Sequence, residues 1–300
     1  MFARFSDASG NLQGSMYMLF AMASFAVGDA IMKSVSTALP LSQILVIRGS
    51  FACVGFLAIA KLTGAMRPLS AAFKAPIVLR ITGEIIATYF FLTALFNMPI
   101  ANATAILQAL PLTVSLGAAW FLGEPIGWRR IVAIVLGFFG VLLIVKPGLA
   151  GFSVFSVFCL VAVFGATLRD LATRRIDEDV PSVYVSLVTV FMTVVFAIVL
   201  IPFQPWQPIG IYEISILGVA SVFLMSGFIS IVSAMRVGEV PVVTPLRYSV
   251  LVFAVIIGFL VFDEWPDMLT IGGSIIVVAS GLFTLYRETV TTKHRDRNRS

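Results

Sequence analysis

The chain has 300 residues, of which 59% are hydrophobic and 12% are charged, and its mean hydropathy is +1.04. This composition leaves too little polar surface to cover a soluble globule, so an ordinary soluble enzyme is excluded. The formal charge of +5 does not indicate a nucleic-acid partner, because the basic residues are scattered between apolar segments and gather only after residue 286. Cys53 and Cys159 stand alone in apolar segments, so we expect no disulfide framework.

Ten apolar segments are long enough to be membrane-spanning helices, given the roughly 20 residues that a helix needs to cross the hydrocarbon core. In chain order the predicted spans are 14–36, 41–61, 76–98, 100–122, 128–146, 152–175, 181–203, 211–235, 239–262 and 267–286. Proline, glycine and short charged runs separate them. We therefore expect an all-α integral membrane protein with ten transmembrane helices in the lipid bilayer.

The distribution of basic residues predicts the orientation of these helices. On the side of the N-terminus the loops and ends carry fourteen Lys and Arg residues, against Lys33 and Lys146 on the opposite side. Because cytoplasmic loops are enriched in Lys and Arg, we predict that both termini are cytoplasmic and that the protein lies in the cell inner membrane. Residues 287–300 then form a basic cytoplasmic tail.

A shift of 140 residues brings the two halves of the chain into register. It places Thr104 on Thr244 and Glu124 on Glu264, and both glutamates end an apolar segment, where we expect them to cap a turn. Each half holds five predicted spans, and a repeat with an odd number of spans must reinsert upside down. The sequence thus predicts two inverted five-helix repeats, 14–146 and 152–286, an architecture common among secondary transporters. A general similarity between apolar helices is the alternative interpretation.

Three motifs of the first half resemble the EamA domain of the drug/metabolite transporter superfamily. They are ALFNMPIANATAILQALP at 94–111, LGEPIGWRR at 122–130 and KPG at 146–148, and residues 239–264 repeat the pattern more loosely. The resemblance covers about residues 14–286. It implies ten helices in two inverted EamA repeats, a central cavity and alternating access. The family includes amino-acid exporters and uptake systems for vitamins, nucleoside-type metabolites and S-adenosylmethionine.

Four arginines lie inside predicted spans: Arg48, Arg80, Arg169 and Arg247. A guanidinium at mid-bilayer costs at least about 2.5 kcal/mol, so such residues usually face a bundle interior or a watery cavity and mark the path of a solute. This pattern indicates a protein that moves something across the membrane.

The ninth span carries a candidate solute site. Arg247 stands beside Pro241 and Pro245, which release backbone carbonyls, and its guanidinium suits a carboxylate, phosphate or planar carbonyl group. The equivalent region of the fourth span is polar, and Tyr89 in the third span can stack on a flat ligand. The predicted substrate-binding residues are Arg247, Tyr248, Thr244, Asn102, Thr104, Gln108 and Tyr89. Ordinary interhelical hydrogen bonding and packing are the alternative roles.

Another group of charged residues is a candidate for coupling or gating: Asp29, Arg48, Glu84 and Arg169. Asp29 falls on Arg169 under the 140-residue shift, and an intramembrane carboxylate can take up a proton and couple transport to a proton gradient. Pairing with Arg48 is the structural alternative for Asp29. We expect Glu84 to pair with Arg80, four residues before it on the same helix face, and Asp170 to pair with Arg174.

Catalysis has little basis in this sequence. His294, the single histidine, lies in the basic tail, and neither a P-loop nor a G-x-S-x-G motif occurs. We therefore expect no enzyme, catalytic residue, cofactor or metal site. The predicted function is a secondary transporter that moves a small polar metabolite, such as riboflavin or S-adenosylmethionine, with protons as a candidate coupling ion. An amino-acid or drug exporter, an intramembrane lipid-modifying enzyme and an accessory membrane subunit remain alternatives.

Overall fold

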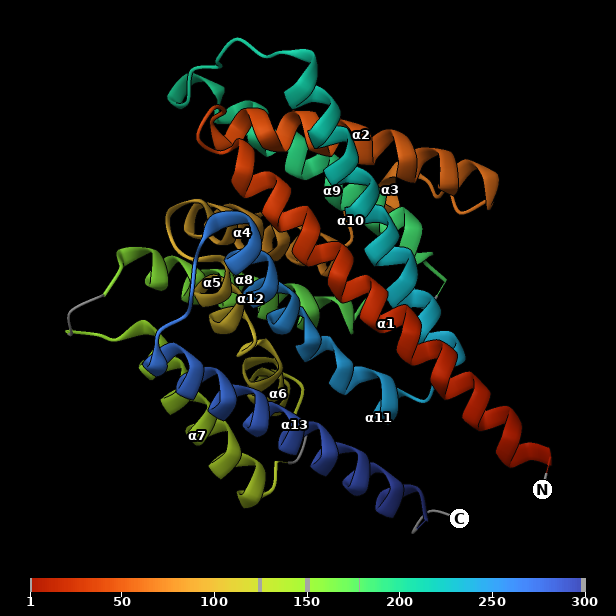
Figure 1. Cartoon of the computed structure of the whole chain (residues 1–300). Helices are drawn as coiled ribbons and strands as arrows, with labels where there is room; N and C mark the ends of the chain where they lie inside the picture. The colour runs from red at the N-terminus through yellow and green to blue at the C-terminus, as the bar shows by residue number, and fades with distance from the viewer. Residues whose placement is uncertain (1, 124–125, 149–151, 178, 298–300) are drawn as a thin grey trace. The chain divides into compact units, whose positions relative to one another are not determined.

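The computed structural model describes residues 2–123, 126–148, 152–177 and 179–297, and every regular element in these ranges is a helix. Ten of the described helical segments are long and apolar enough to cross a membrane, which confirms the ten predicted spans. The helices, labelled in Figure 1, are α1 (Phe2–Val35), α2 (Leu41–Leu62), α3 (Leu69–Ala72), α4 (Ala75–Asn97), α5 (Ile100–Leu107), α6 (Leu110–Phe121), α7 (Trp128–Val145), α8 (Val154–Thr173), α9 (Ser182–Val199), α10 (Ile211–Val237), α11 (Val240–Val243), α12 (Ser249–Phe262) and α13 (Met268–Arg297). Two 3₁₀ segments are η1 (Ile201–Phe203) and η2 (Thr244–Tyr248). Glu124, predicted to cap a turn, lies outside the described residues.

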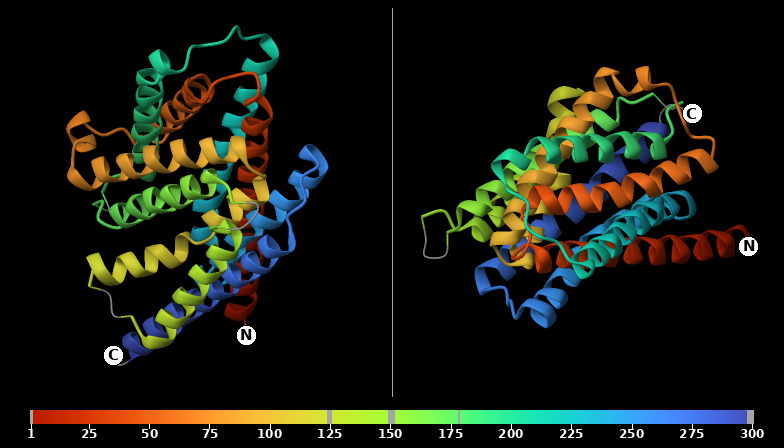
Figure 2. Two further views of the ribbon diagram at one scale, coloured as in Figure 1. Left: turned by 90° about the vertical axis from the view of Figure 1, so that its left-hand side faces the viewer. Right: turned by 90° about the horizontal axis from the view of Figure 1, so that it is seen from above.

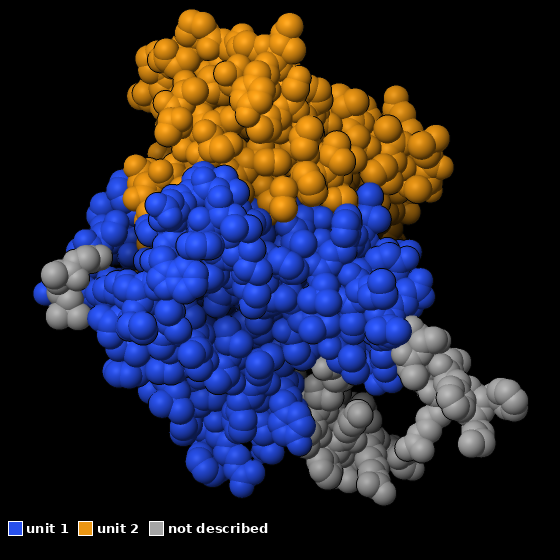
Figure 3. Space-filling model, in the orientation of Figure 1, with its two compact units in different colours: residues 1–26, 99–157, 227–300 blue, residues 27–98, 158–226 orange. Residues whose placement is uncertain are grey.

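Two compact units make up the chain, and each is coloured separately in Figure 3. Unit 1 comprises Met1–Ala26, Pro99–Val157 and Gly227–Ser300, and unit 2 comprises Val27–Met98 and Phe158–Ser226. The units therefore differ from the two halves of the sequence. Unit 1 contains the fourth, fifth, ninth and tenth spans. Unit 2 contains the second, third and seventh spans and most of the sixth, and the boundary between the units divides the first and eighth spans.

Within each unit, spans that are equivalent under the 140-residue shift pack against one another. In unit 1, α7 of the fifth span lies along α13 of the tenth, and the fourth span contacts the ninth through α5 and α12. In unit 2, α2 of the second span lies along α9 of the seventh. The first of these pairs can be followed in Figures 1 and 2. Gly140 of α7 and Gly273 of α13 allow close approach, because a Cβ at Gly140 would be only 2.8 Å from the Gly273 carbonyl oxygen. Pairing of equivalent helices is the arrangement that a pseudo-two-fold axis produces.

One helix contact occurs twice in equivalent positions. In unit 2, a Cβ at Gly165 would be 2.7 Å from the Ala87 backbone nitrogen. In unit 1, the Phe25 ring occupies the space over Gly227, where a Cβ would be 2.7 Å from ring atom Cε1. The shift of 140 places Gly165 on Phe25 and Ala87 on Gly227. The two helix crossings are therefore equivalent: in unit 2 two small residues face each other, and in unit 1 an aromatic ring faces a glycine.

Polar contacts within unit 2 join loops that lie on the same side of the spans. Successive spans run in opposite directions, so every second loop is on the same side. At one set of loops Lys33 Nζ donates to the Met98 carbonyl at 2.5 Å, and Gln43 exchanges hydrogen bonds of 2.9 and 3.0 Å with the backbone of Gln207. At the other set, Lys74 forms a 2.6 Å ion pair with Asp177. These contacts connect only loops that the ten-span topology places on one side.

Candidate solute site and charged network

The fourth and ninth spans, both in unit 1, are each interrupted between helical segments. Gln108 and Ala109 separate α5 from α6, and Pro111 in the first turn of α6 has no N–H to donate to the Leu107 carbonyl. In the ninth span the 3₁₀ segment η2 stands between α11 and α12 and contains Pro245. The two interruptions map onto one another under the 140-residue shift. Discontinuous helices of this kind build the solute sites of many inverted-repeat transporters.

Contacts at the other end of these helices bring the two interruptions to the same level. The Glu264 carboxylate, just after α12, accepts a hydrogen bond from the Ile100 N–H at 2.9 Å, and the Ile100 side chain lies against Gly258 of α12. Helices α5 and α12 are therefore antiparallel. Because both rise about 1.5 Å per residue, Gln108 lies level with Val250, next to the end of η2.

The Ile100 contact also gives the role of Glu264. We predicted that this glutamate caps a turn, and its carboxylate does cap, but on the first amide of α5 rather than in its own loop. A carboxylate is favourable there because the N-terminus of a helix carries partial positive charge.

Buried polar atoms without partners gather at the two interruptions. Seven buried side-chain nitrogen or oxygen atoms of the described residues have no hydrogen-bond partner, and five belong to this region: Asn102 Oδ1, Gln108 Nε2, Thr244 Oγ1, the Tyr248 hydroxyl and Ser249 Oγ. Leaving a buried polar group unsatisfied costs about 1–3 kcal/mol. A ligand or water that hydrogen-bonds to these atoms would remove that cost, so the region has the chemistry of a binding site.

Ser249 was missing from the sequence prediction. The signal was present, because Ser249 directly follows Tyr248 and begins α12, but a serine at a helix start is usually interpreted as a cap. Here its hydroxyl has no hydrogen-bond partner.

Packing holds the η2 segment in place. Val243 before it is buried against Met18, Met22 and Ala234. The Tyr248 ring is buried, and a Cβ at Gly281 of α13 would overlap its hydroxyl, so only glycine leaves room for this tyrosine.

The predicted substrate-binding residues divide between the two units. Arg247 is exposed beside the buried Tyr248, and Thr104 is buried on α5. Together with Thr244, Asn102 and Gln108, they all belong to unit 1. Tyr89 instead belongs to unit 2, where its ring contacts Phe90 and Phe196 edge-on at centroid distances of 5.3 and 5.8 Å.

Unit 2 contains a charge-balanced network inside its spans. Its members are Arg48, Arg80 and Arg169 with Asp29, Glu84 and Asp170. At its centre, Arg169 of α8 binds the Glu84 carboxylate of α4 with an Nη1–Oε2 distance of 3.2 Å and the Asp170 carboxylate with an Nε–Oδ1 distance of 2.8 Å. Gly83 permits this approach, because a Cβ there would be 2.6 Å from the Arg169 backbone nitrogen.

Two predicted ion pairs are wrong. Glu84 pairs with Arg169 rather than with Arg80, because Arg80 instead donates to the Thr189 hydroxyl of the neighbouring α9 at 2.7 Å. Asp170 pairs with Arg169 rather than with Arg174, because Arg169 reaches both carboxylates at once. The Glu84–Arg169 pair joins two helices, whereas Arg169 and Asp170 are neighbours on α8.

Asp29 and Arg48 lie near each other without a direct ion pair among the described residues. Their charges interact, but Arg48 Nη1 contacts the sulfur of Met32, one turn along α1 from Asp29. The Arg48 carbonyl accepts a 2.7 Å hydrogen bond from Ser221, which fixes this part of α2 against α10. Asp29 is thus a half-buried carboxylate beside the charge of Arg48.

Comparison with known proteins gives the family. The model of the EamA-like transporter family matches residues 12–146 and 153–286. An S-adenosylmethionine uptake transporter of Rickettsia prowazekii (strain Madrid E) is 26% identical to this chain. The alignment covers 65% of this chain and 67% of that protein. A riboflavin transporter of Vibrio cholerae is 28% identical over 95% of this chain and 97% of its own. A pseudopaline exporter of Pseudomonas aeruginosa is 28% identical over 89% of this chain and 94% of its own.

A crystal structure with 18% sequence identity has a TM-score of 0.61 over 93% of this chain and 98% of its own, which shows the same fold. The family model covers most of the sequence, and the ten apolar helices agree with it. The chain therefore belongs to the EamA-like transporter family.

Proposed function

We propose that this protein is a secondary transporter that takes up a small polar metabolite across the cell inner membrane by alternating access. The observation that carries the proposal is the group of five unpartnered buried polar atoms at the interruptions of the fourth and ninth spans. Equivalent discontinuous helices that converge at one level are the usual place for a solute in inverted-repeat transporters. The two repeats are residues 14–146 and 152–286.

The chemistry of these atoms indicates the class of solute. Gln108 Nε2 donates, Asn102 Oδ1 accepts, and the hydroxyls of Thr244, Tyr248 and Ser249 do both. Arg247 adds a guanidinium fork for a carboxylate or a planar carbonyl group. S-adenosylmethionine and riboflavin both carry such groups, and relatives named for their transport make them the first candidates.

Export is the second candidate function. The pseudopaline exporter aligns with this chain at the same identity as the riboflavin transporter. We propose transport without chemical change to the solute in either direction. We also propose that both termini are cytoplasmic, and that Asp29 binds a coupling proton.

The central experiment is transport into proteoliposomes with radiolabelled S-adenosylmethionine and riboflavin, together with substitution of Arg247. Arg247→Lys keeps the charge but loses the fork, and Arg247→Ala loses both, so affinity should fall in the order wild type, Lys, Ala. A hydrogen bond to a charged group is worth about 1.5–3 kcal/mol, so Arg247→Ala should weaken solute binding at least about tenfold.

Arg236→Ala is the matched control, because Arg236 is an exposed arginine in the last turn of α10. It should leave affinity unchanged. Arg247→Ala should keep a thermal stability close to that of the wild type. Unchanged kinetics in a folded Arg247→Ala protein would remove Arg247 from the solute site.

A further inference from the structure

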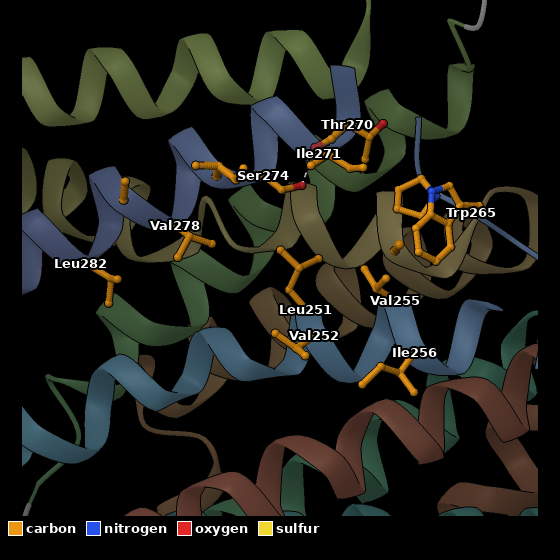
Figure 4. A pocket seen from close by; sticks show the side chains of 14 residues that line it. Leu251, Val252, Val255, Ile256, Trp265, Thr270, Ile271, Ser274, Val278 and Leu282 are labelled. Atoms are coloured by element: carbon orange, nitrogen blue, oxygen red, sulfur yellow. Dashed lines mark hydrogen bonds between the residues drawn. The ribbon is translucent and has the colours of Figure 1, made fainter. Parts of the chain in front are cut away.

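A long apolar groove in unit 1 lies apart from the polar interruptions of the helices. It encloses about 560 Å³ between α12 and α13. Figure 4 shows side chains of both helices directed into it, with Trp265 at one end and Leu282 at the other. The groove exists because α13 packs along α7 and α12 packs along α5, which leaves space between the two consecutive helices.

The walls of the groove offer almost nothing to a polar ligand. Thr270 and Ser274 carry its two hydroxyls, and both are already used: Thr270 Oγ1 donates to the Asp267 carboxylate at 3.2 Å, and Ser274 Oγ donates to the Thr270 carbonyl at 2.6 Å. No side-chain atom of the lining residues is among the unpartnered polar atoms of the described chain. A polar metabolite would therefore lose hydration there without gaining hydrogen bonds.

The groove opens to the surface of the chain at the depth of the membrane. Val252, Ile256 and Ile275 of its walls are 58, 47 and 64% exposed. Both helices belong to candidate membrane spans, and the exposed walls are apolar, so we expect lipid outside the groove.

The length of the groove matches one leaflet. From Thr270 to Leu282 the lining residues follow one face of α13 over twelve residues, which is roughly 18 Å at the rise of an α-helix. One leaflet supplies half of the roughly 30 Å hydrocarbon core. Trp265 stands at the end where the helices leave the membrane, the position that tryptophan prefers at the interface.

We propose that this groove binds one acyl chain of a phospholipid from the leaflet at the Trp265 end. The small side chain of Ala279 contributes to the space that the chain would fill. Because both hydroxyls of the wall are already hydrogen-bonded, the site selects a hydrocarbon chain and makes no distinction between headgroups.

The test uses the full chain in nanodiscs that contain phosphatidylethanolamine or phosphatidylglycerol with a photoactivatable diazirine in the acyl chain. Mass spectrometry should find labels concentrated on residues 251–256 and 271–282, saturating at one lipid per chain and equal for both headgroups. Ala279→Phe should reduce this labelling several-fold by filling the groove. Val261→Phe is the matched control, because Val261 is an exposed residue of α12 outside the groove, and it should leave labelling unchanged.

Several results would overturn the proposal: labels spread evenly over exposed faces such as that of α7, labels insensitive to Ala279→Phe, chain-to-chain cross-links at the groove, or displacement of the label by transported solute. If Ala279→Phe fails to insert, Val278→Phe fills the same space. Solute binding is measured in the same samples. Because the groove lies apart from the solute site, the result for lipid labelling does not depend on whether the proposed transport function is right.

Discussion

At the scale of single residues, hydroxyls that have a hydrogen-bond partner within the protein serve the structure, whereas buried hydroxyls without one are candidates for solute binding. Many serine and threonine hydroxyls in the spans donate to a carbonyl one turn earlier, as Ser233 does to Ile229 at 2.9 Å. Ser249 does not, and its oxygen is buried without a partner. Such an atom is a cost to the folded protein unless something else binds it.

This difference predicts that Ser249→Ala weakens solute binding without reducing stability. A hydrogen bond to the solute is worth about 0.5–1.5 kcal/mol, so the dissociation constant should rise about two- to tenfold, while the melting temperature without solute stays equal or increases. Ligand-dependent thermal shifts measure both. Ser233→Ala is the control and should leave affinity unchanged. A lower melting temperature with unchanged affinity for Ser249→Ala would assign the hydroxyl to structure.

Asp29 provides the test of proton coupling. If it carries the proton, Asp29→Asn should abolish accumulation driven by a pH gradient and leave solute exchange largely intact, because exchange needs no net proton movement. Uptake into proteoliposomes with and without a gradient measures the two modes. Asp179→Asn changes an exposed loop carboxylate and should alter neither. Normal gradient-driven uptake by Asp29→Asn would leave this residue a structural role beside Arg48.

The sequence indicated some of these residues and not others, for a physical reason. Asn102, Gln108 and Thr244 could be found because polar side chains next to prolines in an apolar span are visible in the sequence. The Glu84–Arg169 pair could not, because it joins residues 85 positions apart on helices α4 and α8. Rules of spacing within one helix favoured Arg80, whose partner Thr189 also comes from another helix.

At the scale of elements, hydropathy located all ten spans because each is long and apolar, and their ends were predicted to within a few residues. The short 3₁₀ segment η2 was not predicted as such, since prolines indicate an interruption but not its geometry. The tenth span also continues as helix to Arg297 instead of ending at residue 286.

The start of α13 depends on one carboxylate. Asp267 Oδ1 accepts from the N–H groups of Leu269 at 3.0 Å and Thr270 at 3.1 Å, and Oδ2 pairs with Lys146 at the end of α7. Burial raises the pKa of Asp267, but the hydrogen bonds from Lys146 and Thr270 outweigh it and hold the pKa below its usual value of 3.8.

A lowered pKa means that the charged form of Asp267 stabilises the folded protein. This contribution is present above the unfolded-state pKa of about 3.9 and is lost as the pH falls through the lower folded-state value. Asp267→Ala should therefore cost about 1 kcal/mol at pH 7, the usual value of a helix cap, and its difference from the wild type should narrow below about pH 4. Asp267→Asn, which keeps a cap oxygen, should fall between them. Thermal unfolding in detergent from pH 7 to pH 3 measures this, and a pH-independent difference would contradict it.

At the scale of the whole molecule, the compact units carry the evidence for an internal repeat. Each unit pairs equivalent spans of the two halves: the fifth with the tenth and the fourth with the ninth in unit 1, and the second with the seventh in unit 2. A shift of 140 residues was found in the sequence from a few weak matches, whereas the repeated contact of Gly165 with Ala87 and of Phe25 with Gly227 needed coordinates. Glycine and phenylalanine at equivalent positions have no sequence similarity, although they serve the same helix crossing.

Inversion of the repeats makes a sharp prediction about two loop positions. Arg67 and Gln207 are equivalent under the 140-residue shift, and both are exposed in loops of unit 2. Inverted repeats place equivalent loops on opposite sides of the membrane, and the excess of Lys and Arg around Arg67 predicts that its loop is cytoplasmic. In a background with Cys53→Ala and Cys159→Ala, a membrane-impermeant maleimide should label Gln207→Cys in intact cells and Arg67→Cys only after the membrane is opened.

The two substitutions test two separate features of the topology: the inversion of the repeats and the orientation of the chain in the membrane. Labelling of both cysteines from the same side would contradict inverted repeats, because five spans between equivalent positions must reverse the side. Labelling of Arg67→Cys from outside and of Gln207→Cys only after opening would keep the inversion and reverse the orientation. Arg67 and Gln207 are 140 residues apart, and both are exposed in unit 2. If both cysteine variants transport solute at the wild-type rate, a difference in their labelling therefore reports the side of the membrane and not misfolding or poor access of the reagent.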